Sequence, residues 1–384
     1  MKYFIIVPEI ADKIEEEWAQ CLKQIINFRV AGYQLIKMNV FTDLPDYETF
    51  IRVNRKIGET IIDALGDECP VFNVTAHPPE PPWKVTIEAG YLKVDSSEII
   101  RKKWNTIPYV VRVSHLGKEL WAGGMGTGFF PYDTRKAAGE AFCQMKGILD
   151  AEQMSFDHLV RQWNYIGNIL EVKNGVQNYQ IFNKVRGEYY QKYRSIQSYP
   201  AATGVGMKHG GVQLDFYGIK PEQSVKLFPV DNPDQIKPYS YGQQVLKGIQ
   251  DGGQRKKQPP QFERAVLLVD KLIATLYVSG TASIIGQDTI GIEDIDNQTS
   301  VTIENVGKLY DLNRLNRLMG NSETSTGKLS MLRVYIKDQD YFVKVKQICE
   351  ECFPGVPVSY IETDLCRDNL LVEMEAEFSI DILK

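Results

Sequence analysis

The stretch Val372-Glu373-Met374-Glu375-Ala376-Glu377-Phe378 near the C-terminus predicts a β-strand, and two earlier stretches share its pattern. These are Val85-Thr86-Ile87-Glu88-Ala89-Gly90-Tyr91 and Val212-Gln213-Leu214-Asp215-Phe216. Each follows a loop and another predicted strand, and an amphipathic helix precedes each strand pair. Because a pattern that recurs along a chain indicates a repeated structural unit, the sequence predicts a fold built from copies of one small α/β unit.

Aligning the three strands separates a shared carboxylate from a unique one. Glu375 aligns with Glu88 and Asp215, so every copy has an acid there, and we expect a structural role such as capping a neighbouring element. Glu373 aligns with uncharged residues in the other copies. Residues 373 and 375 lie on one face of the strand because side chains alternate with period two. The sequence favours Glu373 for chemistry; the alternative is that both glutamates only satisfy backbone N–H groups.

Predicted strands of four to eight residues alternate with helices, which is typical of an α/β or α+β layer structure. We expect mixed sheets with helices on one face. Residues 1–92 are predicted to form a partial unit, 93–220 a complete unit, 221–261 a linker loop and 262–384 a second complete unit. The predicted helices are Ile14–Asn27, Tyr47–Leu65, Thr134–Leu149, Ser155–Asn168, Asn178–Lys192, Asn297–Asn313 and Asp340–Cys352.

Composition excludes several classes of function. The chain has 384 residues, 43% of them hydrophobic and 24% charged, and a net charge of −5, which argues against a general nucleic-acid binder. No stretch reaches the roughly 18 apolar residues that span a membrane, and Met1–Val7 predicts a first strand rather than a signal peptide. We therefore expect a soluble, cytoplasmic protein.

Metal, redox and nucleotide sites are not predicted. Cys349 and Cys352 form a single CxxC without a nearby histidine, and the four histidines share no ligand spacing. The glycines of Gly123–Gly128 lack the full dinucleotide-binding spacing, and Phe129-Phe130-Pro131 follows where a helix should begin.

The repeated unit resembles the RidA-like (YjgF) fold, whose members associate as trimers with ligand sites in the clefts between units. Val372–Ala376 matches that family's last strand. The Gly280-Thr281-Ala282-Ser283 turn, with Gln298 and Asn305 on the following helix, matches the first half of its unit.

Five longer stretches, in order over roughly residues 120–384, resemble the chorismatases, enzymes that cleave the enolpyruvyl ether of chorismate. The sequence departs from that family in its N-terminal part, in a longer polar loop between Tyr241 and Phe262, and at Gln287, where a histidine is expected. The stretches are Val160–Ile166 with Asn178–Asn183 and Arg186; Tyr199–Gly206; Asn232–Gln235 with Tyr239, Tyr241-Gly242, Pro260, Phe262, Arg264 and Ala265; Val278–Gly286; and Asp364–Glu373.

The resemblance implies a cofactor-independent enzyme of secondary metabolism, with a homotrimer as its assembly. Its products would be pyruvate and either a hydroxybenzoate or a dihydroxycyclohexadiene carboxylate. Hydrolysis of an enol ether begins with protonation of its double bond, so we expect Glu373 to be the general acid. Burial beside Val372 and Met374, and a second carboxylate at Glu375, would raise its pKa. In the family, a cysteine at the place of Cys366 together with a turn glycine goes with 3-hydroxybenzoate as product, so the resemblance implies Cys366 as a second catalytic residue. The alternative is a buried cysteine that acts only as a small hydrophobic residue.

Chorismate is a small dianion, so its site needs cationic anchors. The candidates are Arg186, Arg333, Lys337 and Arg367, although any one of them is more often a surface or interface ion pair. Tyr179, Tyr239 and Tyr335 are candidates to wall the ring, and Gly280 would let the substrate approach the backbone. An ordinary turn glycine and core tyrosines are the alternatives.

Two other functions stay open. One is an imine/enamine deaminase of the RidA type, which relies on an arginine that would fall near Val356–Tyr360, where the sequence has none. The other is a non-catalytic relative that binds a small acid, which Gln287 and the long polar loop favour.

Overall fold

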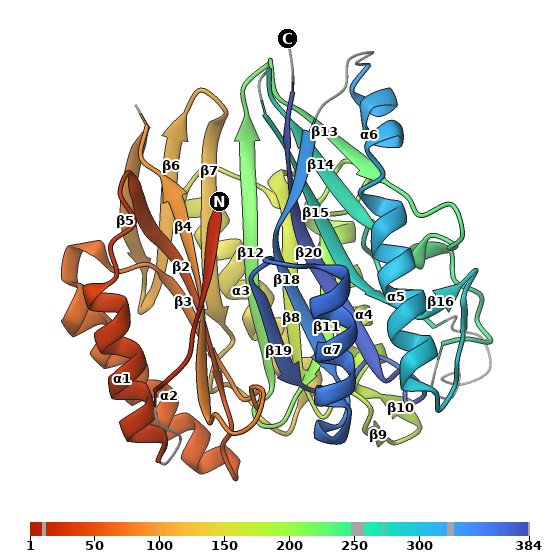
Figure 1. Ribbon diagram of the computed structural model, residues 1–384, viewed down its shortest axis with the longest axis horizontal. Helices are drawn as coiled ribbons and strands as arrows, with labels where there is room; N and C mark the ends of the chain where they lie inside the picture. The colour runs from red at the N-terminus through yellow and green to blue at the C-terminus, as the bar shows by residue number, and fades with distance from the viewer. Residues whose placement is uncertain (10–12, 96, 247–256, 272, 321–325, 383–384) are drawn as a thin grey trace.

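The computed structural model describes residues 1–9, 13–95, 97–246, 257–271, 273–320 and 326–382, and within them the chain forms three large β-sheets with helices outside (Figure 1). The first sheet has the order β1-β4-β2-β3 and carries two helices. Its elements are β1 (Lys2–Ile6), α1 (Ile14–Asn27), β2 (Tyr33–Thr42), α2 (Tyr47–Leu65), β3 (Val71–Thr75) and β4 (Val85–Lys93).

The second sheet has the order β11-β8-β12-β7-β6-β5, with β8 and β11 parallel and the other pairs antiparallel. Its elements are β5 (Glu98–Trp104), β6 (Ile107–Ser114), β7 (Gly117–Met125), α3 (Thr134–Ala151), β8 (Leu159–Gly167), α4 (Asn178–Tyr193), β11 (Ala201–Met207) and β12 (Val212–Pro221); a small hairpin, β9 (Val172–Lys173) and β10 (Val176–Gln177), precedes α4.

The third sheet has the order β13-β14-β15-β20-β18-β19, which repeats the second sheet strand for strand when both are followed from the parallel pair. Its elements are β13 (Lys226–Val230), β14 (Ala265–Val269), β15 (Ile273–Ala282), α5 (Ile295–Leu309), α6 (Leu312–Met319), β18 (Thr326–Ile336), α7 (Phe342–Cys352), β19 (Val358–Glu362) and β20 (Val372–Asp381), with a small hairpin of β16 (Ile284–Ile285) and β17 (Asp288–Thr289). The predicted class, mixed sheets with helices on one face, is confirmed.

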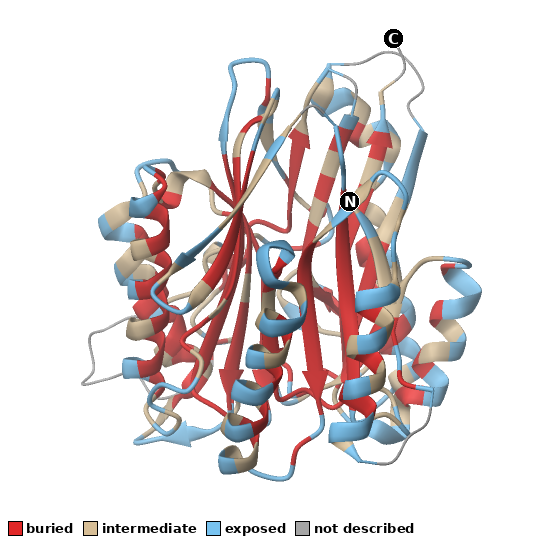
Figure 2. Cartoon of the chain, turned by 90° about the vertical axis from the view of Figure 1, so that its left-hand side faces the viewer, coloured by how far each residue is buried: buried red, intermediate tan, exposed pale blue. Residues whose placement is uncertain are grey.

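The three sheets pack together through the faces that their helices leave free, and the helices form the outer layer. Strands are buried along most of their length, whereas the helices expose their outer sides (Figure 2). One apolar cluster joins all three sheets and includes Val71, Trp121, Tyr217 and Leu268. Burying it couples the sheets, because removing apolar area from water contributes about 25 cal/mol per Å².

Two parts of the sequence prediction are wrong. Residues Ser155–Asn168, predicted as a helix, form a short 3-10 turn and then strand β8. Eight of the nine residues of β8 are buried, so both faces of the strand are covered. The sequence therefore lacks the alternation of polar and apolar residues that indicates a half-exposed strand. The predicted linker 221–261 contains strand β13, and the part of this loop at 247–256 lies outside the described residues. The division of the chain into units otherwise stays a prediction.

In the described part of the chain, no helix is both long and apolar enough to cross a membrane.

Candidate active site

The three aligned carboxylates lie at three equivalent junctions between sheets. At each junction the carboxylate of one sheet receives a hydrogen bond from the parallel edge strand of the next sheet. Glu375 of β20 accepts from Thr203 of β11, Asp215 of β12 from Asn73 of β3 at 2.9 Å, and Glu88 of β4 from Ser359 of β19 at 3.3 Å. Each of these carboxylates joins two sheets, which is the structural role that the alignment predicts for them.

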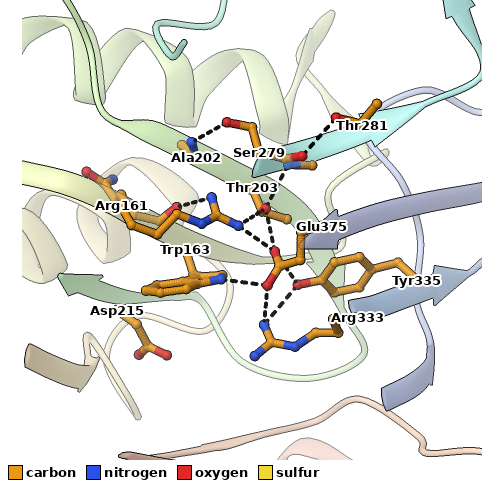
Figure 3. Close-up of polar contacts among 12 residues, drawn as sticks. Arg161, Trp163, Ala202, Thr203, Asp215, Ser279, Thr281, Arg333, Tyr335 and Glu375 are labelled. Carbon is orange, nitrogen blue, oxygen red and sulfur yellow. Dashed lines mark hydrogen bonds and ion pairs between the residues drawn. The ribbon is translucent and has the colours of Figure 1, made fainter. Parts of the chain in front are cut away.

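Glu375 has the most complete set of partners (Figure 3). One of its oxygens accepts from Trp163 Nε1 at 2.7 Å and pairs with Arg333 at 2.9 Å. The other accepts from Thr203, from Arg161 at 2.7 Å and from Tyr335 at 3.1 Å. Burial alone would raise the pKa of this carboxyl, but the Arg333 and Arg161 guanidiniums outweigh burial and hold it below its usual value. Glu375 is therefore ionised.

Glu373 lies two residues before Glu375 on β20 and has a different environment. It is 4% exposed, and its carboxyl forms no hydrogen bond with another residue in the described part of the chain. Burial, and then the negative charge of Glu375, raise its pKa to about 8, while Arg161 and Arg264 oppose the shift. A carboxyl with this pKa keeps its proton at neutral pH, so Glu373 can donate a proton.

Gly280 makes the space that Glu373 occupies. A Cβ atom added to Gly280 would lie 2.0 Å from Glu373 Oε1 and 3.0 Å from Cδ. The glycine lies where the pairing of β15 with β20 shifts register, between the pairs that contain Val278 and Thr281. The backbone thus bulges away from the partner strand at the point where the carboxyl packs.

A cavity opens in front of Glu373, between the second and third sheets. The predicted site residues that line it are Tyr179, Gly280, Cys366, Arg367 and Glu373. Its other walls come from α4, from β11 and from residues within 241–246 and 260–264. These remaining lining residues are Gln177, Gln180, Asn183, Ala202, Gly204, Tyr241, Val245, Leu246, Pro260, Phe262, Arg264, Ala282, Ile284 and Leu370.

The ion pairs among Arg161, Glu375, Arg333 and Glu88 form a buried ionic network. Two predicted substrate-binding residues lie in this ionic network instead of the cavity. Arg333 pairs with both Glu88, at 2.6 Å, and Glu375, so its charge is neutralised by two carboxylates. The Tyr335 hydroxyl donates to Glu375 and accepts from Arg333 at 3.1 Å. The structure places both side chains in contacts between sheets and not on the cavity wall, so a contact with a substrate stays a prediction for both.

Three more predicted binding residues also lie off the cavity wall. Lys337 is partly exposed and donates to the carbonyl of Asp368. Tyr239 contacts the ring of Tyr199, with centroids 5.2 Å apart. Arg186 is buried on α4 behind Asn183, whose side-chain oxygen accepts from it at 2.6 Å.

The Cys366 side chain is a neutral thiol on the cavity wall. Burial and the neighbouring Glu373 raise its pKa to about 12, although Arg367 opposes the shift. A thiol with so high a pKa is not a nucleophile at neutral pH, so Cys366 shapes the cavity rather than attacking a substrate.

Arg264 is a cationic residue of the cavity that the set of predicted site residues lacks. It is 2% exposed and donates to the carbonyl of Ile236 at 2.8 Å and to the Tyr241 hydroxyl at 2.6 Å. Its Nε has no hydrogen-bond partner among the described residues. Arg367 likewise donates to the carbonyl of Gln287, at 2.8 Å. Neither guanidinium has a carboxylate within ion-pair distance in the described ranges, so the cavity wall carries net positive charge.

Gln287 does not line the cavity but contacts two segments that do. Its side-chain oxygen accepts from the Gly242 amide at 2.9 Å, and its carbonyl accepts from Arg367. The residue that departs from the family pattern therefore holds the loop and the arginine in place.

We expect the Glu373→Gln variant to be more stable than the wild type at alkaline pH. A carboxyl whose pKa is raised from 4.5 to about 8 on folding stabilises the fold fully below its unfolded pKa and loses that contribution as pH rises to the folded value. Glutamine does not titrate. The difference in unfolding free energy between variant and wild type should therefore grow by up to about 4 kcal/mol between pH 5 and pH 8.5, as measured by urea unfolding. A difference that is equal at both pH values would contradict the raised pKa.

Comparison with known proteins places the chain among the chorismatases. The family model "Chorismatase FkbO/Hyg5-like, N-terminal" matches residues 127–218. The 3-hydroxybenzoate synthase of Streptomyces hygroscopicus is 29% identical over 69% of this chain and 75% of its own length. A chorismatase of Streptomyces rapamycinicus is 30% identical over 65% of this chain and 72% of its own length. A chorismatase crystal structure covers 98% of both chains with a TM-score of 0.67 at 17% identity, which shows the same fold. The chain belongs to the chorismatase family.

Proposed function

We propose that this protein cleaves the enolpyruvyl ether of chorismate to pyruvate and a hydroxybenzoate, with Glu373 as the general acid. The observation that carries the proposal is a buried carboxyl with a pKa of about 8, facing a cavity that also holds two arginines without carboxylate partners among the described residues. The relatives named chorismatase and 3-hydroxybenzoate synthase supply the substrate and product.

The proposed chemistry starts with transfer of the Glu373 proton to the methylene carbon of the enolpyruvyl group. The ether oxygen then stabilises the resulting oxocarbenium ion, and Glu373 becomes a carboxylate. Water adds to this ion and gives up a proton to the Glu373 carboxylate, which forms a hemiketal and restores the acid. The hemiketal collapses to pyruvate and a dihydroxycyclohexadiene carboxylate. Loss of water from that ring gives a hydroxybenzoate, so the net reaction to hydroxybenzoate consumes no water.

Arg264 and Arg367 are the proposed anchors for the two carboxylates of the substrate. Both already donate to carbonyl or hydroxyl oxygens, which fixes their orientation and leaves further donors for a ligand. Tyr179 lies over Gly204 at the cavity, where its ring can contact the ring of the substrate. Because these donors are already oriented, little free energy is spent on reorganising them when a dianion binds.

Gly280 and Cys366 favour the 3-hydroxybenzoate branch of the family. Both lie at the cavity. Gly280 packs against the Glu373 carboxyl, and Cys366 lies close enough to Glu373 for that carboxyl to raise the pKa of its thiol. The dihydroxycyclohexadiene carboxylate is the alternative product, and chromatography of the reaction mixture distinguishes the two.

Purified protein should release pyruvate from chorismate, measured by coupling to lactate dehydrogenase. Because the acid must be protonated, kcat/KM should be constant below about pH 8 and fall tenfold per pH unit above it. Failure of a folded protein to release pyruvate between pH 5 and pH 9 would refute the proposal. Chorismate binding without turnover would instead support a non-catalytic relative that binds small acids.

The residues that line the cavity all belong to this chain. Assembly as a homotrimer and a cytoplasmic location stay predictions.

A further inference from the structure

Thr203 stands between the ionic network and the proposed general acid. It is buried on β11, and its hydroxyl lies within hydrogen-bond distance of three groups. The Gly280 amide donates to Thr203 Oγ1 at 2.9 Å, and Arg161 Nη2 donates to it at 2.6 Å. The third contact is to Glu375 Oε2 (Figure 3).

The direction of the third hydrogen bond follows from the other two. A threonine hydroxyl has one proton to donate and two lone pairs to accept with. The Gly280 amide and Arg161 occupy both lone pairs, so the proton must point to Glu375. That arrangement needs an ionised Glu375, which its other four donors already favour. The Thr203 hydroxyl is therefore saturated and held in one orientation.

The same threonine fixes the surface against which the acid packs. Gly280 is the residue whose missing Cβ accommodates the Glu373 carboxyl, and Thr203 Cγ2 lies 3.2 Å from that Cβ position. The amide of Gly280 belongs to the bulged part of β15 and has Thr203 as its partner. Without the hydroxyl, this partly buried amide would lose its acceptor, and the bulge would lose this contact with the second sheet.

We propose that Thr203 is a positioning residue for Glu373, linking the Gly280 amide to the Glu375 carboxylate so that the bulge and the neighbouring negative charge both stay in place. The proposal rests on the proposed function for its catalytic meaning. Thr203 does not touch the substrate; it acts through Gly280 and Glu375 on the environment that keeps Glu373 protonated.

The other two junctions show which part of this arrangement is structural. Asn73 and Ser359 occupy the place of Thr203 and also donate to the buried carboxylate of the next sheet. The residue aligned with Glu373 is Gln213 at one junction and Thr86 at the other. The contact between sheets is thus common to all junctions, and only the junction with Thr203 couples it to an acid. Ser359 therefore provides a matched control.

The test compares Thr203→Val, which keeps the shape and removes the hydroxyl, with Thr203→Ser and Ser359→Ala. In Thr203→Val, we expect kcat to fall about 10- to 100-fold with KM changed less than about threefold. The alkaline limb of the pH–rate profile should move at least about half a pH unit lower. A relaxed bulge would admit water to Glu373, and the loss of one donor would make the ionised form of Glu375 less stable. Both changes would lower the pKa of Glu373. Thr203→Ser should retain the wild-type profile, and Ser359→Ala should leave its alkaline limb unmoved.

A second measurement does not depend on activity. The pH dependence of the stability change caused by Glu373→Gln is measured in the wild-type and Thr203→Val backgrounds, and in Thr203→Ala if the valine variant is unstable. Thr203 substitution should shift the midpoint of that dependence to lower pH. An unchanged midpoint, an unchanged pH–rate profile or an equal shift in Ser359→Ala would overturn the proposal. If the wild type releases no pyruvate, the proposed function fails, while the stability midpoint still decides whether Thr203 controls the protonation of Glu373.

Discussion

Replacing Glu373 with glutamine should lower kcat for pyruvate release by about 1,000-fold, because general acid catalysis typically contributes a factor of 10² to 10⁴. Glutamine has nearly the same shape and fits the space beside Gly280, but it cannot donate a proton to carbon. KM should change little, since Glu373 is not one of the proposed anchors for the substrate carboxylates. Steady-state assays of pyruvate release at pH 7, with the lactate dehydrogenase couple, measure both constants.

Glu377→Gln is the matched control for this prediction. Glu377 lies on the same strand and the same face, and its carboxylate accepts from the Tyr3 hydroxyl at 2.7 Å, outside the cavity. Its activity should stay within about twofold of the wild type, because substitutions outside the site rarely affect the chemical step. A Glu373→Gln variant that retained more than a tenth of the wild-type kcat would show that another group supplies the proton.

The proposed acid could be singled out from the sequence because the fold repeats. Comparing Glu373 with the aligned residues of the other copies separates it from Glu375, whose counterparts Glu88 and Asp215 form the same kind of contact between sheets. A single-copy fold would have offered two adjacent glutamates on one face with no means to rank them.

The proposed anchors could not be ranked in the same way, although Arg367 is one of the predicted candidates. Arg333 lies on the strand beside Glu373, but its side chain points into the three-sheet junction, where two carboxylates surround it. Which face of a doubly buried strand meets a cavity depends on the packing of the neighbouring sheets and not on the local sequence. The role of Arg161 could not be predicted for a related reason: the sequence predicts a helix where the structure has β8.

Arg264 shows a different limit of the sequence. It belongs to one of the stretches shared with the family, but nothing local marks it as a site residue. Some of its neighbours in the cavity come from α4, from β20 and from the chain around Cys366, more than 70 residues away in either direction. Only the packing of the second sheet against the third brings these segments together.

The ionic network also explains why the acid can be buried beside another carboxylate. Without cationic partners, burial would raise the pKa of both carboxyls. Arg333 and Arg161 instead keep Glu375 ionised, so that only Glu373 has a raised pKa. The buried ion pairs themselves are weak evidence for stability, since desolvation offsets much of their attraction. Their consequence here is a fixed negative charge two residues from the acid.

Replacing Arg264 with methionine should lower kcat/KM for chorismate about 100-fold, mainly through KM, because a hydrogen-bonded pair with a charged group contributes about 1.5–3 kcal/mol. Methionine keeps the length of the side chain and removes the charge. Arg194→Met is the matched control, since Arg194 also donates to backbone carbonyls, those of Ser198 and Phe156, but lies outside the cavity.

A second readout of Arg264→Met separates lost binding from general damage. The Arg264 charge opposes the raised pKa of Glu373, so its removal should move the alkaline limb of the pH–rate profile to higher pH. Arg194→Met should leave that limb in place even if it lowers the free energy of unfolding. A loss of kcat with unchanged KM and an unmoved limb would mean that Arg264 supports the fold of the cavity rather than holding the substrate beside the acid.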